Sequence, residues 1–175
     1  MDEYVLREGG RFERDSAAWA QWASDHGWTY QPAAPELAGR YEPVFSTGAE
    51  RYHHLLTTEL HGLPVAAFEH QKFQQGKNGA EPLRSLLSFI VVRLPGLPPD
   101  EYIKMGAEKT IRKLGGTIPS GYYLKLVGDE LVARRSGALD RRTLQSQSEL
   151  QALQIASVPT SFWRPGFPNG AKPQD

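Results

Sequence analysis

Residues 51–73 constrain the fold most strongly, because two strand patterns meet there at a minimal turn. The segment is RYHHLLTTELHGLPVAAFEHQKF. The pair His61-Gly62 stands between two largely apolar runs, and a two-residue turn with glycine second is typical of a β-hairpin. We therefore predict strands near residues 52–60 and 63–73, paired in an antiparallel sheet.

Other segments extend this sheet. The run LRSLLSFIVVRL follows as a third strand, and its nearly continuous apolar character favours a central position covered on both faces. The segment GYYLKLVGDELVAR predicts a second hairpin that turns at Gly128-Asp129, and WTYQ predicts a short strand before the first hairpin.

Helical periodicity appears in three places. Residues 15–26 carry Trp19, Trp22 and Ala23 on one face, and Gly27 is placed to end the helix. Residues 100–114 predict one continuous helix with a single apolar stripe formed by Ile103, Ala107, Ile111 and Leu114. A last helix precedes Pro159, and it starts either at Asp140 or at a capping box of Ser146 and Glu149.

The predicted fold class is α+β. A mostly antiparallel sheet, with a three-strand meander and a second hairpin, carries about three helices on one face. We expect a flexible N-terminal arm over residues 1–14, a single domain over residues 15–160, and a Pro/Gly-rich tail over residues 161–175.

Composition excludes several classes of protein. The chain has no cysteine, which removes disulfides, thiol nucleophiles and thiolate metal sites. The 20 basic residues equal the 20 acidic residues, and this balance argues against nucleic acid as a partner. No segment has the ~18 apolar residues of a membrane span, so we expect a cytoplasmic protein without membrane contact.

Four polar residues of the first hairpin form the candidate site: His53, His54, Glu69 and His70. A turn at residues 61 and 62 places His53 opposite His70 and His54 opposite Glu69. Because side chains alternate along a strand, the two pairs are expected on opposite faces. As cross-strand pairs near a sheet end, they predict a cost of about 1 kcal/mol or less for His54→Ala or His70→Ala.

A catalytic or metal-binding role for this cluster is the alternative. Two imidazoles could share a metal ion, and Glu69 could orient His54, but the pattern supplies neither a third ligand nor an activated nucleophile. Ser85 and Ser88 lie on the third strand, and no GxSxG or HExxH motif occurs. No catalytic, metal-binding or cofactor-binding residue is assigned, and no cofactor is expected.

Two aromatic residues near the C-terminus form a second candidate contact region. Trp163 and Phe167 lie in SFWRPGFPNG, which holds too much proline and glycine for a helix or central strand. They either fold back onto the domain, the leading hypothesis, or dock on another chain.

The segments GWTY, PVFSTG, HGLPVAAFEHQKF and VVRLPGLPP resemble those of a family of small uncharacterised actinobacterial proteins. The resemblance covers roughly residues 20–100, and His70 stands where the family pattern has tyrosine. The family implies no activity that could be transferred. The order of elements is also similar to that of small secretion-type chaperones, which bind an unfolded segment of another protein.

The leading functional hypothesis is a non-enzymatic protein-interaction, adaptor or chaperone-like module. Its partner is another protein or a second copy of the chain. Two alternatives remain open: a metal-dependent or hydrolase-like enzyme that uses the hairpin histidines, and a structural component of a larger assembly.

Overall fold

A single antiparallel sheet organises the chain. In this computed structural model, which describes residues 15–41, 50–73 and 83–164, six strands lie in the order β1-β2-β3-β4-β6-β5. Their bounds are β1 Thr29–Ala33, β2 Glu50–Leu60, β3 Leu63–Phe73, β4 Leu83–Arg93, β5 Tyr123–Val127 and β6 Glu130–Ser136. The predicted α+β class is confirmed, and β4 lies inside the sheet as expected.

Both predicted hairpin turns are confirmed. His61 and Gly62 have φ angles of 52° and 76°, the pair of positive values that a type I′ turn requires. The second hairpin turns at Gly128, whose φ is 57°, and Val127 lies opposite Glu130 across the turn. Both turns match the right-handed twist of their strands.

The predicted register of the first hairpin is correct only near the turn. Leu56 lies opposite Ala67, as a turn at residues 61 and 62 requires, but beyond a β-bulge His53 lies opposite Glu69 and Tyr52 lies opposite His70. The predicted pairs His53/His70 and His54/Glu69 are therefore wrong by one residue. Two residues of β2 span one residue of β3 at the bulge, and this shifts every later pair.

The N-terminal helix, residues 15–26, is confirmed. Gly27 follows it with a φ of 73°, and the Trp28 amide donates a hydrogen bond to the Ala23 carbonyl at 2.8 Å. A left-handed residue just past the last turn is a common way to end a helix.

The predicted continuous helix over residues 100–114 is wrong. It is two short helices, α2 Asp100–Met105 and α3 Ala107–Lys113, separated by Gly106 with φ 90° and ψ 155°. That extended glycine conformation is incompatible with a continuing helix. The break leaves Ile103 44% exposed on α2, while Ala107 and Ile111 on α3 remain buried.

The last helix, α4, runs from Leu144 to Ala156. Neither predicted start is right, although the Asp140 carbonyl accepts the first turn's amide bonds from Thr143 and Leu144. The capping box is absent, because the Ser146 hydroxyl donates to the Thr143 carbonyl.

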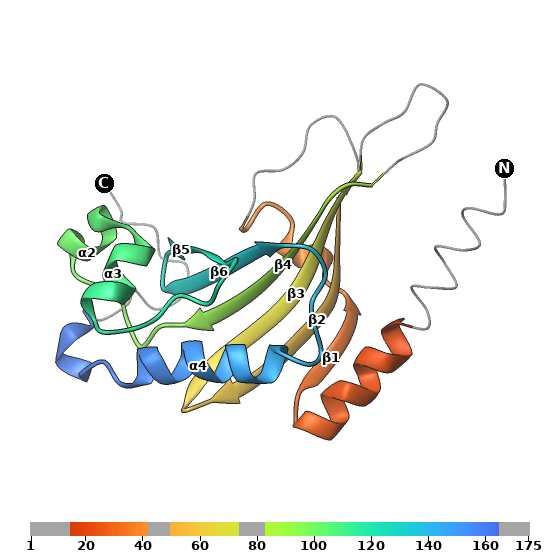
Figure 1. The fold of residues 1–175 in the computed structure, drawn as a ribbon, viewed down its shortest axis with the longest axis horizontal. Coiled ribbons are helices and arrows are strands. Elements are labelled where there is room, and N and C mark those ends of the chain that lie inside the picture. The colour runs from red at the N-terminus through yellow and green to blue at the C-terminus, as the bar shows by residue number, and fades with distance from the viewer. Residues whose placement is uncertain (1–14, 42–49, 74–82, 165–175) are drawn as a thin grey trace, which may run out of the picture.

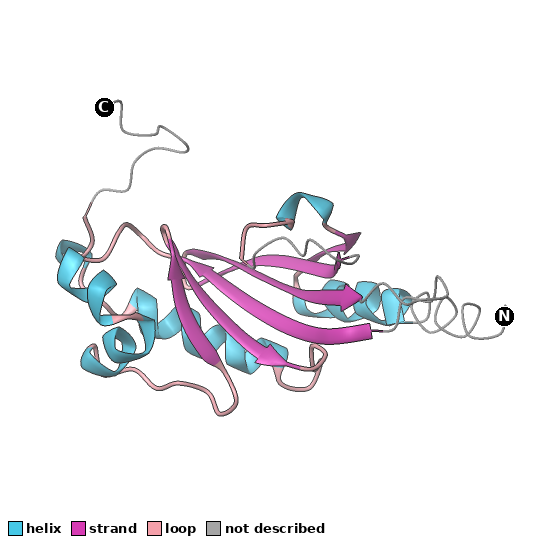
Figure 2. Cartoon of the chain, turned by 90° about the horizontal axis from the view of Figure 1, so that it is seen from above, coloured by secondary structure: helices cyan, strands magenta, loops and turns pink. Residues whose placement is uncertain are grey.

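Helices cover one face of the sheet, with α4 and the N-terminal helix below it and α2 and α3 at one end (Figure 1). The core on that face joins Trp19 and Trp22 to strand residues such as Leu56 and Ile90. A smaller core on the other face contains Tyr41, Phe68 and Phe89 and is associated with the short 3-10 helix η1, Pro35–Leu37. Figure 2 shows the twist of the strands from above.

The chain folds back after α4. A second 3-10 helix, η2 Thr160–Phe162, leads to a bridge in which Leu97 and Arg164 exchange backbone hydrogen bonds. Trp163 packs against the helix-side core, as the fold-back hypothesis predicts for this residue. Phe167, the arm over residues 1–14 and the tail beyond residue 164 lie outside the described residues.

Candidate functional site

The hairpin histidines lie on both faces of the sheet. Opposed residues of an antiparallel pair share a face, so His53 lies with Glu69 and Tyr52 lies with His70. Glu69 and His70 are neighbours on β3 and therefore point to opposite faces. The bulge keeps His54 on the same face as His53, beneath the N-terminal helix.

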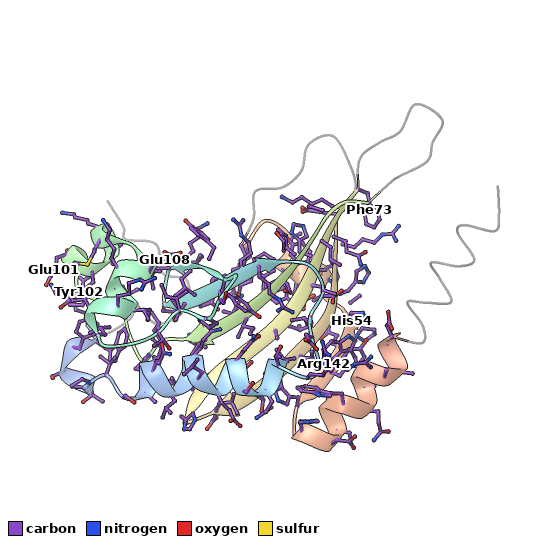
Figure 3. All side chains as sticks on the ribbon, viewed as in Figure 1. His54, Phe73, Glu101, Tyr102, Glu108 and Arg142 are labelled. Carbon is purple, nitrogen blue, oxygen red and sulfur yellow. The ribbon has the colours of Figure 1, made fainter. Side chains whose placement is uncertain are left out.

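His54 is held in an unusual backbone conformation. Its φ is 53°, a left-handed value that is uncommon for residues other than glycine, asparagine, aspartate and histidine. Its ring lies 6.1 Å from the Trp19 ring, and its Nδ1 is 2.9 Å from the Tyr30 hydroxyl. Figure 3 shows His54 beside the N-terminal helix. The bulge therefore directs this imidazole into the helix–sheet interface.

The environment of His54 disfavours its protonated form. Burial is the main cause of a pKa lowered from 6.5 to about 4, and His53 and Arg141 lower it further against an opposing effect of Asp15. Burial, followed by Arg51, also lowers the pKa of His53. His54 is therefore neutral at pH 7, and the uncharged ring forms a hydrogen bond with the Tyr30 hydroxyl.

Glu69 holds the segment before α4. Its Oε1 accepts a hydrogen bond from the Leu139 amide at 2.8 Å. Burial raises the pKa of Glu69, and the Leu139 hydrogen bond partly opposes that rise. The carboxylate thus ties β3 to the connection that leads into α4, which is a structural role.

His70 belongs to the opposite face. It is fully buried and stacks on Tyr52, with ring centroids 4.3 Å apart, and its Nε2 lies 3.2 Å from Glu50 Oε2. Both His54 and His70 are thus core residues. We therefore expect His54→Ala and His70→Ala to cost more than the value of about 1 kcal/mol predicted from the sequence. Removal of either imidazole leaves its buried hydrogen-bond partner unpaired.

The hairpin cluster does not assemble a recognised catalytic unit. Within residues 15–41, 50–73 and 83–164, no group of three or more His, Asp or Glu side chains is placed to hold a metal ion. Ser88 lies opposite Glu69, but it is fully buried and its hydroxyl accepts a hydrogen bond from Arg135 Nε at 3.1 Å. Ser88 is therefore buried in the sheet and engaged by Arg135.

The two faces of α4 are the feature that sequence analysis missed. Ser148 and Gln151 are 0% and 2% exposed on the side toward the sheet, whereas Leu150 and Leu153 are 38% and 48% exposed on the outside. The Ser148 hydroxyl and both amide atoms of Gln151 have no hydrogen-bond partner among the described residues. The inward face also buries Leu144, Ala152 and Ile155, so α4 keeps an apolar contact with the core but departs from the usual amphipathic pattern at these four positions.

Glutamine side chains hold α4 at three points along its length. Gln145 accepts a hydrogen bond from the Trp28 indole at 2.7 Å, and Gln147 accepts one from the Tyr122 hydroxyl at 2.7 Å. Gln154 donates to the Thr117 hydroxyl at 3.1 Å. These bonds fix the rotation of α4, so they determine which of its faces points outward.

Comparison with known proteins found no matching family model, no matching curated protein and no matching solved structure. The resemblance to small actinobacterial proteins therefore stays a prediction. Among the helices of the described segments, none is long and apolar enough to cross a membrane.

Proposed function

We propose that the protein is a non-enzymatic protein-interaction module that binds its partner through the outward face of α4. The observation that carries this proposal is the pair Leu150 and Leu153, which are exposed on a helix that buries Ser148 and Gln151. One exposed leucine needs no explanation. Two on one face, opposite buried polar residues, are a local conflict of the kind expected at functional sites.

Self-packing does not explain the position of the two leucines. A helix of this chain could lower its free energy by placing leucine toward the sheet and glutamine toward water, since buried unpaired amides are costly. The outer face is also almost uncharged, because Glu149 is the only charged residue of α4. Depletion of charge around an apolar centre is typical of protein interfaces.

The enzyme hypothesis receives no comparable support. His54 and His70 lie on opposite faces, and both are buried among aromatic side chains. The hydrogen-bond neighbour of His54 is the Tyr30 hydroxyl and that of His70 is a Glu50 carboxylate oxygen, and these two pairs do not combine into one site. The third hypothesis, a component of a larger assembly, would use the same surface and differs only in the number of partners.

The proposal is tested by a photo-crosslinking amino acid placed at position 150 in the full chain in living cells. We expect a discrete protein adduct that mass spectrometry identifies and that the additional substitution Leu153→Lys abolishes. The matched control is the same crosslinker at Ile103, which is 44% exposed on α2 and lies outside the proposed surface.

The positions at which adducts form show whether α4 carries the proposed interface. An adduct at position 150 and not at position 103 supports the proposal, whether the partner is another protein or the same chain. No adduct at position 150, or equal adducts at both positions, would contradict it.

A further inference from the structure

The outward face of α4 has a symmetric sequence pattern. Ser146, Leu150, Leu153 and Ser157 follow one another at steps of four, three and four residues, so they form one seam along the helix. Reversed end to end, the seam has the same order: serine, leucine, leucine, serine. Steps of three and four are those of helices that pack side by side in bundles.

We propose that the occupant of this face is a second copy of the chain, with the two α4 helices packed antiparallel about a two-fold axis. This inference rests on the proposed function and names its partner. In this register Leu150 of one copy meets Leu153 of the other, and Ser146 meets Ser157. A two-fold interface must be self-complementary in this way, because each contact occurs twice with the roles exchanged.

The serine residues at the ends of the seam can be buried at little cost, because their hydroxyl groups already donate hydrogen bonds within the helix. The Ser146 hydroxyl donates to the Thr143 carbonyl at 3.0 Å, and the Ser157 hydroxyl donates to the Leu153 carbonyl at 2.7 Å. Both donors are satisfied within their own helix, so covering them leaves no hydroxyl proton unpaired. Their small side chains also let two helices approach closely at the ends of the seam.

Charge does not oppose the pairing of two copies. Glu149, the single charged residue of α4, accepts a hydrogen bond from Gln145 at 2.6 Å. The antiparallel register places Glu149 of one copy toward Gln154 of the other, so the two carboxylates are kept apart. The chain as a whole carries a formal net charge of zero, which removes long-range repulsion between copies.

The size of the seam limits its strength. Interfaces that bury less than about 1,000 Å² in total are weak or transient, and a contact centred on two leucines from each copy falls in this class. We therefore expect a dimer that forms reversibly as concentration rises, with a dissociation constant on the order of 100 µM.

Sedimentation equilibrium of the full chain, from about 10 µM to about 1 mM, tests the proposal. The wild-type chain should shift from monomer toward dimer over this range. L150E and L153K should each reduce the association constant at least tenfold. The double variant L150E/L153K should recover most of it, because each introduced carboxylate then faces an introduced ammonium group of the other copy.

Two controls protect the interpretation. Circular dichroism checks that each variant keeps the fold, which is expected because positions 150 and 153 are exposed. I103K, which places the same charge on α2, should leave the association constant unchanged.

A wild-type chain that stays monomeric at the highest concentration would overturn the second-copy proposal. If position 150 still crosslinked to a different protein, the proposed function would survive that result. A dimer that L150E and L153K weaken but the double variant fails to restore would contradict the antiparallel register.

Discussion

The N-terminal helix and α4 pack on the same face of the sheet but are held there by different chemistry. The N-terminal helix buries Trp19 and Trp22, whose rings meet edge to face with centroids 5.6 Å apart. The Trp22 indole also donates to the Arg141 carbonyl at 3.1 Å. In α4, by contrast, Ser148 and Gln151 are buried without partners among the described residues, beside the smaller apolar contact of Leu144, Ala152 and Ile155, and Leu150 and Leu153 face outward.

The difference separates an element that is packed for the fold from one for which we propose a second role in binding a partner. Large buried aromatic rings contribute much of the stability of a core. A helix that buries unpaired polar groups contributes less than its area implies, because their desolvation opposes the gain. The comparison therefore predicts large effects for changes beneath the N-terminal helix and small or stabilising effects in α4.

The largest effect is expected for Trp22→Ala. Removal of a buried indole typically costs about 3–5 kcal/mol, and Trp22 is 8% exposed. Chemical denaturation should show this loss, while Trp22→Phe, which keeps a ring, should lose clearly less. An unchanged unfolding midpoint for Trp22→Ala would contradict the assignment of this helix to the core.

A pH effect is expected at the same interface. The pKa of His54 is about 4 in the folded chain and 6.5 as its ordinary value, so between these values the unfolded chain binds more protons. The contribution of His54 to the free energy of unfolding is therefore fully present above pH 6.5. It falls as the pH drops toward 4, by about 3 kcal/mol.

Thermal melts between pH 4 and pH 7 measure this slope. His54→Asn should flatten it, because asparagine tolerates a positive φ but does not titrate in this range. The matched control is His61→Asn at the other positive-φ histidine, in the hairpin turn, which tests whether the substitution by itself disturbs a left-handed backbone position. Equal slopes in wild type and His54→Asn would exclude a contribution from His54.

In α4 a stabilising change is expected. Gln151→Leu replaces an amide that has no hydrogen-bond partner in the described segments by an apolar side chain, and it should raise the free energy of unfolding by about 1 kcal/mol. The control Gln147→Leu removes the acceptor of the Tyr122 hydroxyl bond and should lower it by a similar amount. If both substitutions destabilise the chain equally, Gln151 has a partner that this account lacks.

The smallest effect is expected at Leu153. Leu153→Ser changes a side chain that is 48% exposed, so its effect on monomer stability should lie within about 0.5 kcal/mol. A melting curve at low concentration measures it. A loss of several kcal/mol would show that this leucine supports the fold rather than an interface.

Local patterns predicted the elements that depend on neighbouring residues. The turns at His61-Gly62 and Gly128-Asp129, and the helix end at Gly27, each follow from one glycine in its local context. The bulge at His54 did not, because no residue type there demands an extra residue in the strand. The break at Gly106 was hidden by an apolar spacing that continued across it.

The functional candidate was hidden for a different reason. In α4, leucine, glutamine and serine alternate without a strong apolar stripe, so the sequence does not determine which face is buried. Contacts with Trp28, Tyr122 and Thr117 fix the rotation, and these residues are distant in sequence. The heptad-like steps of Ser146, Leu150, Leu153 and Ser157 were the available signal.

Amide hydrogen exchange of the two helices, in dilute and in concentrated protein, tests the central comparison most directly. We predict that Trp22 and Ala23 are strongly protected at both concentrations. Ala152 and Ile155 should be less protected in dilute protein, and their protection should rise selectively in concentrated protein. Equal protection of both helices, independent of concentration, would contradict the view that α4 is the weakly held, partner-binding element.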